Sequence, residues 1–382
     1  MDAHSTLSDF SLVKGGPLYR TECRLHLASS KLTRVVWCAL VFALLAWLPL
    51  VALTFPRGDT ALRSLFAGLQ VHAKLLLALP VLVAAEPYID GRIAQAARQF
   101  LDSHLVGVGS RPAFEKSARA AMRWLDSNLA EACLLIASFA LSFASDLDFH
   151  RGWAVAGAEE RLSLAGWWYL TVSQPLFWFL ALRWVWRGTL WGVFLFRVSR
   201  LPLALMPTHP DVTGGLGFLP ICQSSFAPVV FSLSVVLSSY TWDAQVVGLA
   251  SSPLPYLIPL ITLGMLAAVV VFAPLGFFTP QLLKAKRRGV SAFSALAAWH
   301  SRQFERRWFH GRTGEHPLGA PEFSSLADLG SAFTVARKMR MFPWDQRSLL
   351  CFAAGSLAPL PILLIMDRKF LAVLEYLCGG LL

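Results

Sequence analysis

The chain has few charged residues for its length. Asp, Glu, Lys and Arg make up 15% of its 382 residues, whereas hydrophobic residues make up 55%, and the mean hydropathy is +0.54. This balance excludes an ordinary soluble protein of two or three domains and indicates a polytopic membrane protein. An aromatic content of 12% further excludes disordered, collagen-like and coiled-coil chains.

Sequence motifs that carry chemistry are also missing. The six cysteines are scattered singly without a CxxC pair, which argues against a disulfide framework and a zinc knuckle. There is no HExxH, no GxSxG, no Walker-type lysine loop and no DxDxDG calcium loop. We therefore expect no cofactor, no metal and no catalytic residue of a soluble-enzyme type, although a membrane-embedded lipid enzyme stays open.

Long apolar windows are abundant. A helix needs roughly 20 apolar residues to cross the hydrocarbon core, and hydrocarbon leaves no other economical way to satisfy the backbone. Seven windows meet that length: 35–55, 68–87, 129–147, 165–186, 216–240, 254–279 and 349–366. The predicted fold is an all-α, polytopic transmembrane bundle of about seven spans with extended cytoplasmic helices.

The basic residues predict the orientation and the domain layout. With the N-terminus inside, 27 of the 34 Lys and Arg residues lie on the cytoplasmic side, as the positive-inside rule requires. The layout is then a cytoplasmic segment (1–34), a transmembrane bundle (35–279) with a cytoplasmic loop (88–128), a basic cytoplasmic helical region (280–348), and a C-terminal membrane segment and tail (349–382). The net charge of +11 follows from this topology and from contact with anionic lipid, so nucleic acid is not an expected partner.

Apolar residues recur at helical spacing in the basic region. One helix is predicted to continue the sixth span into the cytoplasm. A second is predicted to begin near Ser324, with an apolar stripe at Leu326, Leu329, Phe333, Met339 and Phe342. Such a helix either covers the ends of the spans or docks a partner.

Glycine and proline concentrate in the segment 207–220, PTHPDVTGGLGFLP, just before the fifth span. The prolines exclude helix, Asp211 can cap the helix that follows, and Gly214, Gly215 and Gly217 permit close approach of the backbone. Free N–H groups at such a helix start could bind an anion or a lipid headgroup. A structural turn, an anion site, and an acid–base role for His209 with Asp211 all stay open.

Polar residues within the spans are candidates for packing, pairing or a pathway. Ser225, Ser232 and Ser239 repeat every seven residues, which places them on one helix face for close packing or for lining a pore. A second set carries charge and lies near the predicted inner ends of spans, where it could form a buried network or extend to the interface. This set comprises Glu86, Glu131, Arg183 and Arg187.

Three stretches resemble segments of known protein sequences: HPDVTGGLGFLP (209–220), LLLALPVLVAAEPYIDGRI (75–93) and SSLADLGSAFTVARKMRMFPW (324–344). Through the patterns HPDxxGGLGFL and SLADLxxxFxVxRxMR, the chain resembles a family of bacterial polytopic inner-membrane proteins over nearly its whole length. The resemblance implies a multi-pass protein of the bacterial inner membrane and assigns neither an activity nor a site residue.

Three functions are compatible with these patterns. The first is a channel or transporter-like pathway for a small ion or solute, possibly an anion, because the spans are interrupted by proline and glycine. A homo-oligomer is expected, since a pore around a symmetry axis leaves no trace in one chain. The second is a signalling or scaffold protein that docks a partner on its basic region, and the third is a lipid-modifying enzyme that uses His209 and Asp211.

Overall fold

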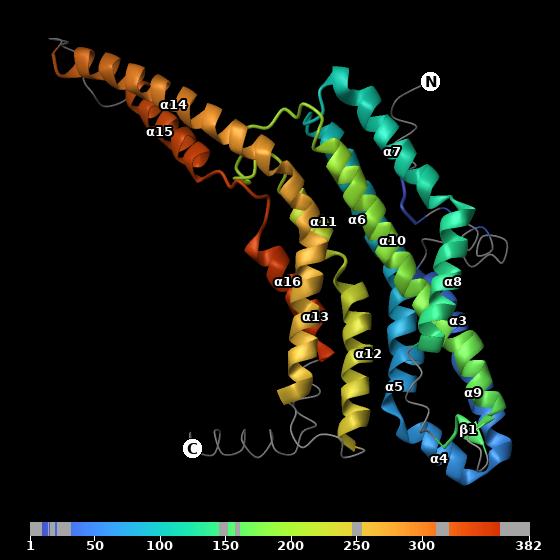
Figure 1. Ribbon diagram of the computed structural model, residues 1–382. Coiled ribbons are helices and arrows are strands. Elements are labelled where there is room, and N and C mark those ends of the chain that lie inside the picture. Colours follow the sequence, from blue (N-terminus) through green and yellow to red (C-terminus); the bar gives the residue numbers. More distant parts are fainter. Residues whose placement is uncertain are drawn as a thin grey trace, which may run out of the picture.

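The computed structural model describes residues 10–13, 15, 20, 32–144, 152–156, 161–246, 254–310 and 321–359. The fold is about 82% helical, and its long helices run side by side along one direction (Figure 1). The end of the predicted window 349–366 and the predicted tail lie outside the described residues, as does most of the segment 1–34.

The first half of the described chain forms a helical hairpin and an angled pair of helices. Its elements are α3 (Leu32–Thr54), η1 (Phe55–Arg57), α4 (Asp59–Ala67), α5 (Leu69–His72), η2 (Ala73–Ala78), α6 (Leu79–Asp102), η3 (Val108–Ser110), α7 (Arg111–Leu125) and α8 (Asn128–Ala144). A two-stranded antiparallel sheet follows, made of β1 (Val155–Ala156) and β2 (Arg161–Leu162). The guanidinium of Arg57 donates to the carbonyl oxygens of Trp153 and Val155, which fastens the sheet to the end of α3.

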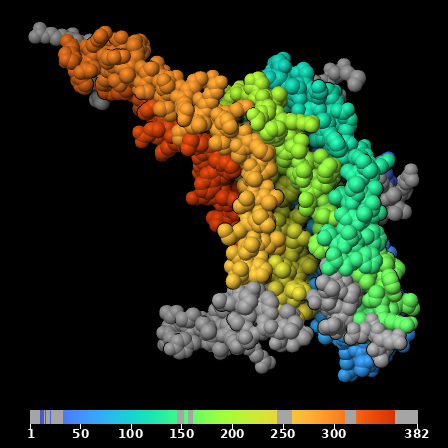
Figure 2. Space-filling model, viewed as in Figure 1, coloured from blue at the N-terminus to red at the C-terminus, as the bar shows by residue number. Residues whose placement is uncertain are grey.

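The second half adds the remaining helices of the bundle and ends in a hairpin that protrudes from it. Its elements are α9 (Leu164–Trp168), η4 (Tyr169–Ser173), α10 (Gln174–Val198), α11 (Phe218–Ser224), α12 (Ala227–Val246), α13 (Leu254–Phe272), η5 (Ala273–Phe278), α14 (Thr279–Trp308), α15 (Pro321–Lys338) and α16 (Gln346–Leu357). Figure 1 shows α14 and α15 extending together beyond the other helices, and the space-filling view shows the same arm (Figure 2). We call this end of the molecule the α14 end.

Four helical runs in the described chain are long and apolar enough to cross a membrane: Thr33–Arg57, Leu69–Asp102, Phe218–Asp243 and Ile258–Trp308. A fifth is obtained if Val108–Leu125 and Asn128–Ala144, which meet at 47°, count as one broken span. The structure therefore supports a helical membrane protein, but it does not confirm the predicted number of seven membrane spans. Window 165–186 does not reach this standard because its Trp, Tyr and Gln residues lower the mean hydropathy, and the described part of window 349–366 forms the short helix α16.

One predicted boundary differs from the observed helix. The second window was expected to end at residue 87, where the loop 88–128 begins, yet α6 continues to Asp102. The helix persists because Asp90 is buried with hydrogen-bond partners and because the sequence AQAARQFL that follows is rich in good helix formers. The apolar face of this extension, with Ala97 and Phe100, is buried against the bundle, while Arg98 and Asp102 are exposed.

A cluster of aromatic side chains fills the core at the α14 end. Phe100 contacts Phe114, Phe218 and Phe278 at centroid distances of 5.9, 5.1 and 6.2 Å, and Phe114 contacts Phe194 at 5.5 Å. Because these rings come from five different segments, they hold α6, α7, α10, α11 and η5 together.

The predicted amphipathic helices of the basic region pack against each other. Phe304 on α14 meets Phe323 on α15 edge to face at 4.8 Å, and Trp308 lies 5.2 Å from Phe323. Arg307 and Glu322 form an ion pair at 2.6 Å. Of the predicted stripe, Leu326, Leu329 and Phe333 are half-buried on α15, whereas Met339 and Phe342 lie beyond the end of this helix at Lys338.

Candidate functional site

Two buried arginines and a glutamate meet where α10 packs against α6. Arg187 Nη1 lies 2.8 Å from Glu86 Oε1, and Arg183 Nη1 lies 3.5 Å from the same oxygen. Glu86 is 8% exposed and Arg187 is 1% exposed. The two arginines lie four residues apart and so share one face of α10. We call these three side chains the arginine–glutamate cluster; they carry two positive charges and one negative charge.

All three residues of the cluster were predicted from the sequence as charge-network candidates, together with a fourth, Glu131. Glu131 lies in the first turn of α8 and is half-buried. Both ion pairs that Arg183 and Arg187 form with described residues are with Glu86, and neither involves Glu131.

A short N-terminal segment lies alongside the cluster. Asp90 follows Glu86 by one helical turn, and its two carboxylate oxygens each lie 2.8 Å from the hydroxyl of Ser11. The backbone N–H of Leu12 donates to Asp90 Oδ1 at 2.9 Å, and Arg183 Nη2 donates to the carbonyl oxygen of Gly15 at 3.4 Å. All of these groups are buried. No sequence pattern pointed to this contact, since residues 10–15 have no apolar period.

A second buried polar cluster lies farther along the same pair of helical runs. Lys74 Nζ donates to Gln174 Oε1 at 2.7 Å and to the Tyr169 hydroxyl at 3.1 Å. The ammonium also lies over the rings of Tyr169 and Phe177, 5.6 and 5.8 Å from their centroids. We call Lys74, Tyr169 and Gln174 the lysine cluster. Lys74 is 3% exposed, and its place near the outer end of the second apolar window marks it in the sequence, as it marks His72.

The lysine cluster lies at two π-helical segments. Lys74 belongs to η2 and Tyr169 belongs to η4, both of which are π-helices inserted in otherwise α-helical runs. Such segments widen the helix by one residue per turn and are frequent at functional sites. Lys74 precedes Glu86 by twelve residues, roughly 18 Å along a helix axis. Buried apolar residues of α6, including Leu79 and Leu82, occupy the interval between the two clusters.

The glycine-rich turn before α11 satisfies its own free N–H groups. Asp211 Oδ1 accepts from the N–H of Thr213 at 2.8 Å, and Oδ2 accepts from Gly215 at 3.0 Å and from Gly217 at 2.8 Å. The carboxylate of Asp211 therefore fills the position in which an anion would bind. His209 Nδ1 lies 2.8 Å from Asp211 Oδ1 and completes the turn.

The backbone of this turn is strained and closely packed. Val212, Gly214 and Gly215 have φ values of 52°, 69° and 98°, a region that a β-branched residue such as Val seldom adopts. Val212 is held there by the N–H of Arg340, which donates to its carbonyl oxygen at 2.7 Å. The turn thus connects α10 and α11 to the residues that follow α15.

The charge state of Asp211 follows from these contacts. Burial raises the pKa of the Asp211 carboxyl, but the hydrogen bonds from Thr213, Gly217 and Gly215 lower it by more, and the net pKa is below its ordinary value of 3.8. Asp211 is therefore ionised at neutral pH and bound within its own turn. This geometry gives no support to an acid–base role for His209 and Asp211.

The serine stripe lies in helix contacts. Ser225, Ser232 and Ser239 are all buried. Their hydroxyls donate to backbone carbonyl oxygens three or four residues earlier, at 2.6 Å to Cys222, 3.0 Å to Pro228 and 2.9 Å to Val236. A hydroxyl that is buried and bound to its own helix favours close packing over lining a water-filled pore.

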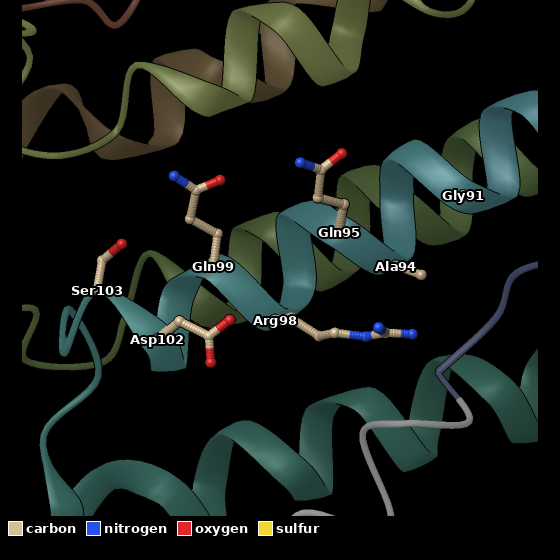
Figure 3. Close-up of a pocket in the computed structure, with 7 residues that line it drawn as sticks. All are labelled: Gly91, Ala94, Gln95, Arg98, Gln99, Asp102 and Ser103. Atoms are coloured by element: carbon tan, nitrogen blue, oxygen red, sulfur yellow. The ribbon is translucent and has the colours of Figure 1, made fainter.

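An open groove runs along the end of α6 at the α14 end. It measures about 630 Å³ and is lined by Gly91, Ala94, Gln95, Arg98, Gln99, Asp102 and Ser103. Figure 3 shows Gln95 and Gln99 projecting from the same side of the helix on successive turns. The groove begins at Gly91, the residue next to Asp90.

Among the described residues, no group of three or more His, Cys, Asp or Glu side chains is arranged to hold a metal ion. No family model, curated protein or solved structure matches the chain.

Proposed function

We propose that the chain is a transporter of the bacterial inner membrane that carries a small anionic solute between α6 and α10. In this proposal α9, η4 and α10 also cross the bilayer, α16 and the residues after it supply the seventh span, and the α14 end is cytoplasmic. The distribution of Lys and Arg supports this orientation.

The observation that carries the proposal is the pair of buried cationic clusters. Charged side chains inside a membrane protein are costly, and they mark ion or substrate pathways more often than they stabilise the fold. Here an ammonium at Lys74 and two guanidiniums at Arg183 and Arg187 are buried along one helix pair. With the buried carboxylate of Asp90 counted beside that of Glu86, the described buried charges along this helix pair are three cationic and two anionic, which favours a negatively charged solute.

Each cluster has a defined part in the proposed pathway. The guanidiniums of Arg183 and Arg187 bind the solute in place of the carboxylate of Glu86, which acts as the internal competitor. The solute then passes to the ammonium of Lys74. Because buried apolar residues of α6 fill the interval between the two clusters, the pathway requires a change of conformation, which favours a transporter over an open channel. The π-helical segments η2 and η4 are positions where such a change can occur.

Uptake by purified protein in liposomes tests the proposal. Chloride, nitrate, phosphate and succinate are each offered, and wild type is compared with Arg187→Gln and Lys74→Gln. The matched control is Arg200→Gln, because Arg200 is an exposed arginine that stacks on Phe196 outside both clusters. We expect uptake of at least one anion that both cluster variants abolish and the control retains. Equal uptake by all four proteins, or none by wild type, contradicts the proposal.

A second function, partner docking by a signalling or scaffold protein, is favoured by the hairpin of α14 and α15. Leu296 and Trp299 are 48% and 54% exposed, and they lie near the basic residues Arg302 and Arg306. A stable partner recovered from detergent extracts and lost on Leu296→Ser with Trp299→Ser would support docking. Substitution of the α15 stripe is a poorer test, since that stripe packs within the hairpin.

A further inference from the structure

We infer that His72 binds the proton that opens the outer end of the pathway between α6 and α10, an inference that rests on the proposed transport function. His72 is the last residue of α5 and directly precedes the π-helical segment η2, which carries Lys74. Figure 1 shows α4 and α5 at the end of the molecule opposite the α14 end. In the proposed orientation, that end faces the outside of the cell.

The contacts of the His72 imidazole fix which of its nitrogens carries hydrogen. Trp47 Nε1 on α3 donates to His72 Nδ1 at 3.0 Å, and His72 Nε2 lies 3.1 Å from the carbonyl oxygen of Leu65 on α4. An indole N–H can only donate, and a carbonyl oxygen can only accept. The ring is therefore neutral with its hydrogen on Nε2, and Nδ1 is the nitrogen that takes up a further proton.

A proton on Nδ1 removes the acceptor of the Trp47 indole and breaks the bond that joins α5 to α3. The same turn of α3 is bonded to the second π-helical segment, since the Ser173 hydroxyl of η4 donates to the carbonyl oxygen of Ala46 at 2.7 Å. Ala46 and Trp47 thus bind both helical runs that form the lysine cluster. Protonation releases the run that carries Lys74, and a proton that binds the released state better shifts the population toward it.

The imidazole is accessible to a proton from the outer medium. His72 is half-buried. Phe66 stacks on its ring at a centroid distance of 5.5 Å and is 54% exposed. An aromatic face attracts a cation, so Phe66 also favours the imidazolium.

The charges around His72 leave its own charge to act on the pathway. The charged residues on α3, α4, η2 and α12 are Arg34, Asp59, Arg63, Lys74 and Asp243. Asp59 and Arg63 are exposed, and the Asp243 carboxylate accepts from the first two N–H groups of α5 at 2.9 and 3.0 Å. Histidine changes charge between about pH 5 and 8. Acidification of the outer medium therefore adds a positive charge two residues before Lys74, where it attracts the anion.

NMR of the full-length chain tests proton binding without any assay of transport. Protein labelled with ¹⁵N-tryptophan is titrated in detergent from about pH 8 to about pH 5, and Trp47→Phe identifies the indole signal of Trp47. We expect this signal to move with one midpoint as Nδ1 is protonated. It should stay still in His72→Gln, whose amide can accept from Trp47 and donate to Leu65 but does not titrate.

The matched control for this titration is His310→Gln, which changes an exposed histidine at the end of α14. Its Trp47 signal should move as in wild type. A Trp47 signal that does not titrate in wild type, or that titrates equally in His72→Gln, overturns the inference.

Uptake at two outer pH values tests the consequence for transport. The transported anion is offered to liposomes at about pH 6 and about pH 8. Wild type and His310→Gln should take it up roughly fivefold faster at the lower pH, the factor that corresponds to loss of one neutral hydrogen bond. His72→Gln should be slow at both values, and comparison with it removes any effect of protonation of the solute itself. Trp47→Phe lacks the bond from the start, so it should exceed wild type at the higher pH.

The outcomes separate this inference from the proposed function. Equal pH ratios in wild type and His72→Gln, or Trp47→Phe no faster than wild type at the higher pH, overturn the control of the pathway by His72. If wild type transports no anion but the Trp47 signal titrates as expected, the proton site stands and the transport function fails.

Discussion

Removal of the Asp211 carboxylate should destabilise the protein far more than removal of an ordinary surface charge. In Asp211→Ala the N–H groups of Thr213, Gly215 and Gly217 lose their shared acceptor, and Thr213 and Gly215 are buried where water cannot easily replace it. With about 1 kcal/mol for each lost hydrogen bond, the expected cost is about 3 kcal/mol. In Asp211→Asn one oxygen remains while the new amide is a donor, so about half of that cost is expected.

Thermal unfolding in detergent, followed by tryptophan fluorescence, measures this difference. The order of stability should be wild type, then Asp211→Asn, then Asp211→Ala. Asp102→Ala is the matched control, because Asp102 is exposed at the end of α6, and its change should stay within about 0.5 kcal/mol. An Asp211→Ala protein as stable as this control would refute the reasoning that the carboxylate holds the turn.

The same carboxylate predicts a pH dependence. Because the pKa of Asp211 is lower in the folded protein than its ordinary value of 3.8, ionised Asp211 contributes its full stabilisation above about that pH. The contribution should disappear as the pH falls through the lowered pKa of the folded state. Asp211→Asn should lack this part of the acid sensitivity, and identical acid profiles for the two proteins would contradict the assignment.

The remaining predictions use the same unfolding assay. Arg187→Leu should cost about 3–5 kcal/mol, because Glu86 keeps a buried charge after losing its shorter ion pair; a change below about 1 kcal/mol would mean that water reaches the pair. Gly214→Ala should cost about 1–3 kcal/mol, since φ is +69° and a Cβ would lie 2.9 Å from Met339 Cε. Gly330→Ala, at an open helical position of α15, should instead be neutral or stabilising by up to about 1 kcal/mol. Ser232→Leu should cost about 1–3 kcal/mol by overpacking, and Ser232→Cys should resist maleimide in the folded protein; rapid labelling would mean that the serine face is wet.

Apolar length alone predicted the parts of the fold that depend on local sequence. The windows 35–55 and 254–279 correspond to α3 and α13 with η5, since an uninterrupted apolar run leaves few alternatives to a helix. The continuation of α6 to Asp102 was not predicted, because Glu86 and Asp90 resemble the end of a span. Their burial depends on partners about a hundred residues later and about eighty residues earlier in the chain, which no local pattern reveals.

The candidate site, too, could be predicted from the sequence only in part. Glu86, Arg183 and Arg187 were recognisable as charges at the ends of apolar windows, but their pairing depends on the rotation of α6 and α10 about their axes. The turn at Asp211 was recognised from its glycines. That its own carboxylate occupies the anion position depends on the left-handed conformations of Val212, Gly214 and Gly215, which the sequence permits without requiring.

The continuous run of α13, η5 and α14 acts mechanically as a lever. It extends from Ile258 to Trp308 and turns away from the bundle along α14 (Figure 1). The helix α14 alone has 30 residues, or about 45 Å of helix. A tilt of about 5° at the start of α14 displaces its far end by about 4 Å, given that length. Close to the fulcrum, Gly289 lies against Pro207, where a Cβ would be only 2.4 Å from the proline ring. A small rotation at the start of α14 is therefore amplified at the tip of the hairpin, and the turn that contains Asp211 lies beside the pivot.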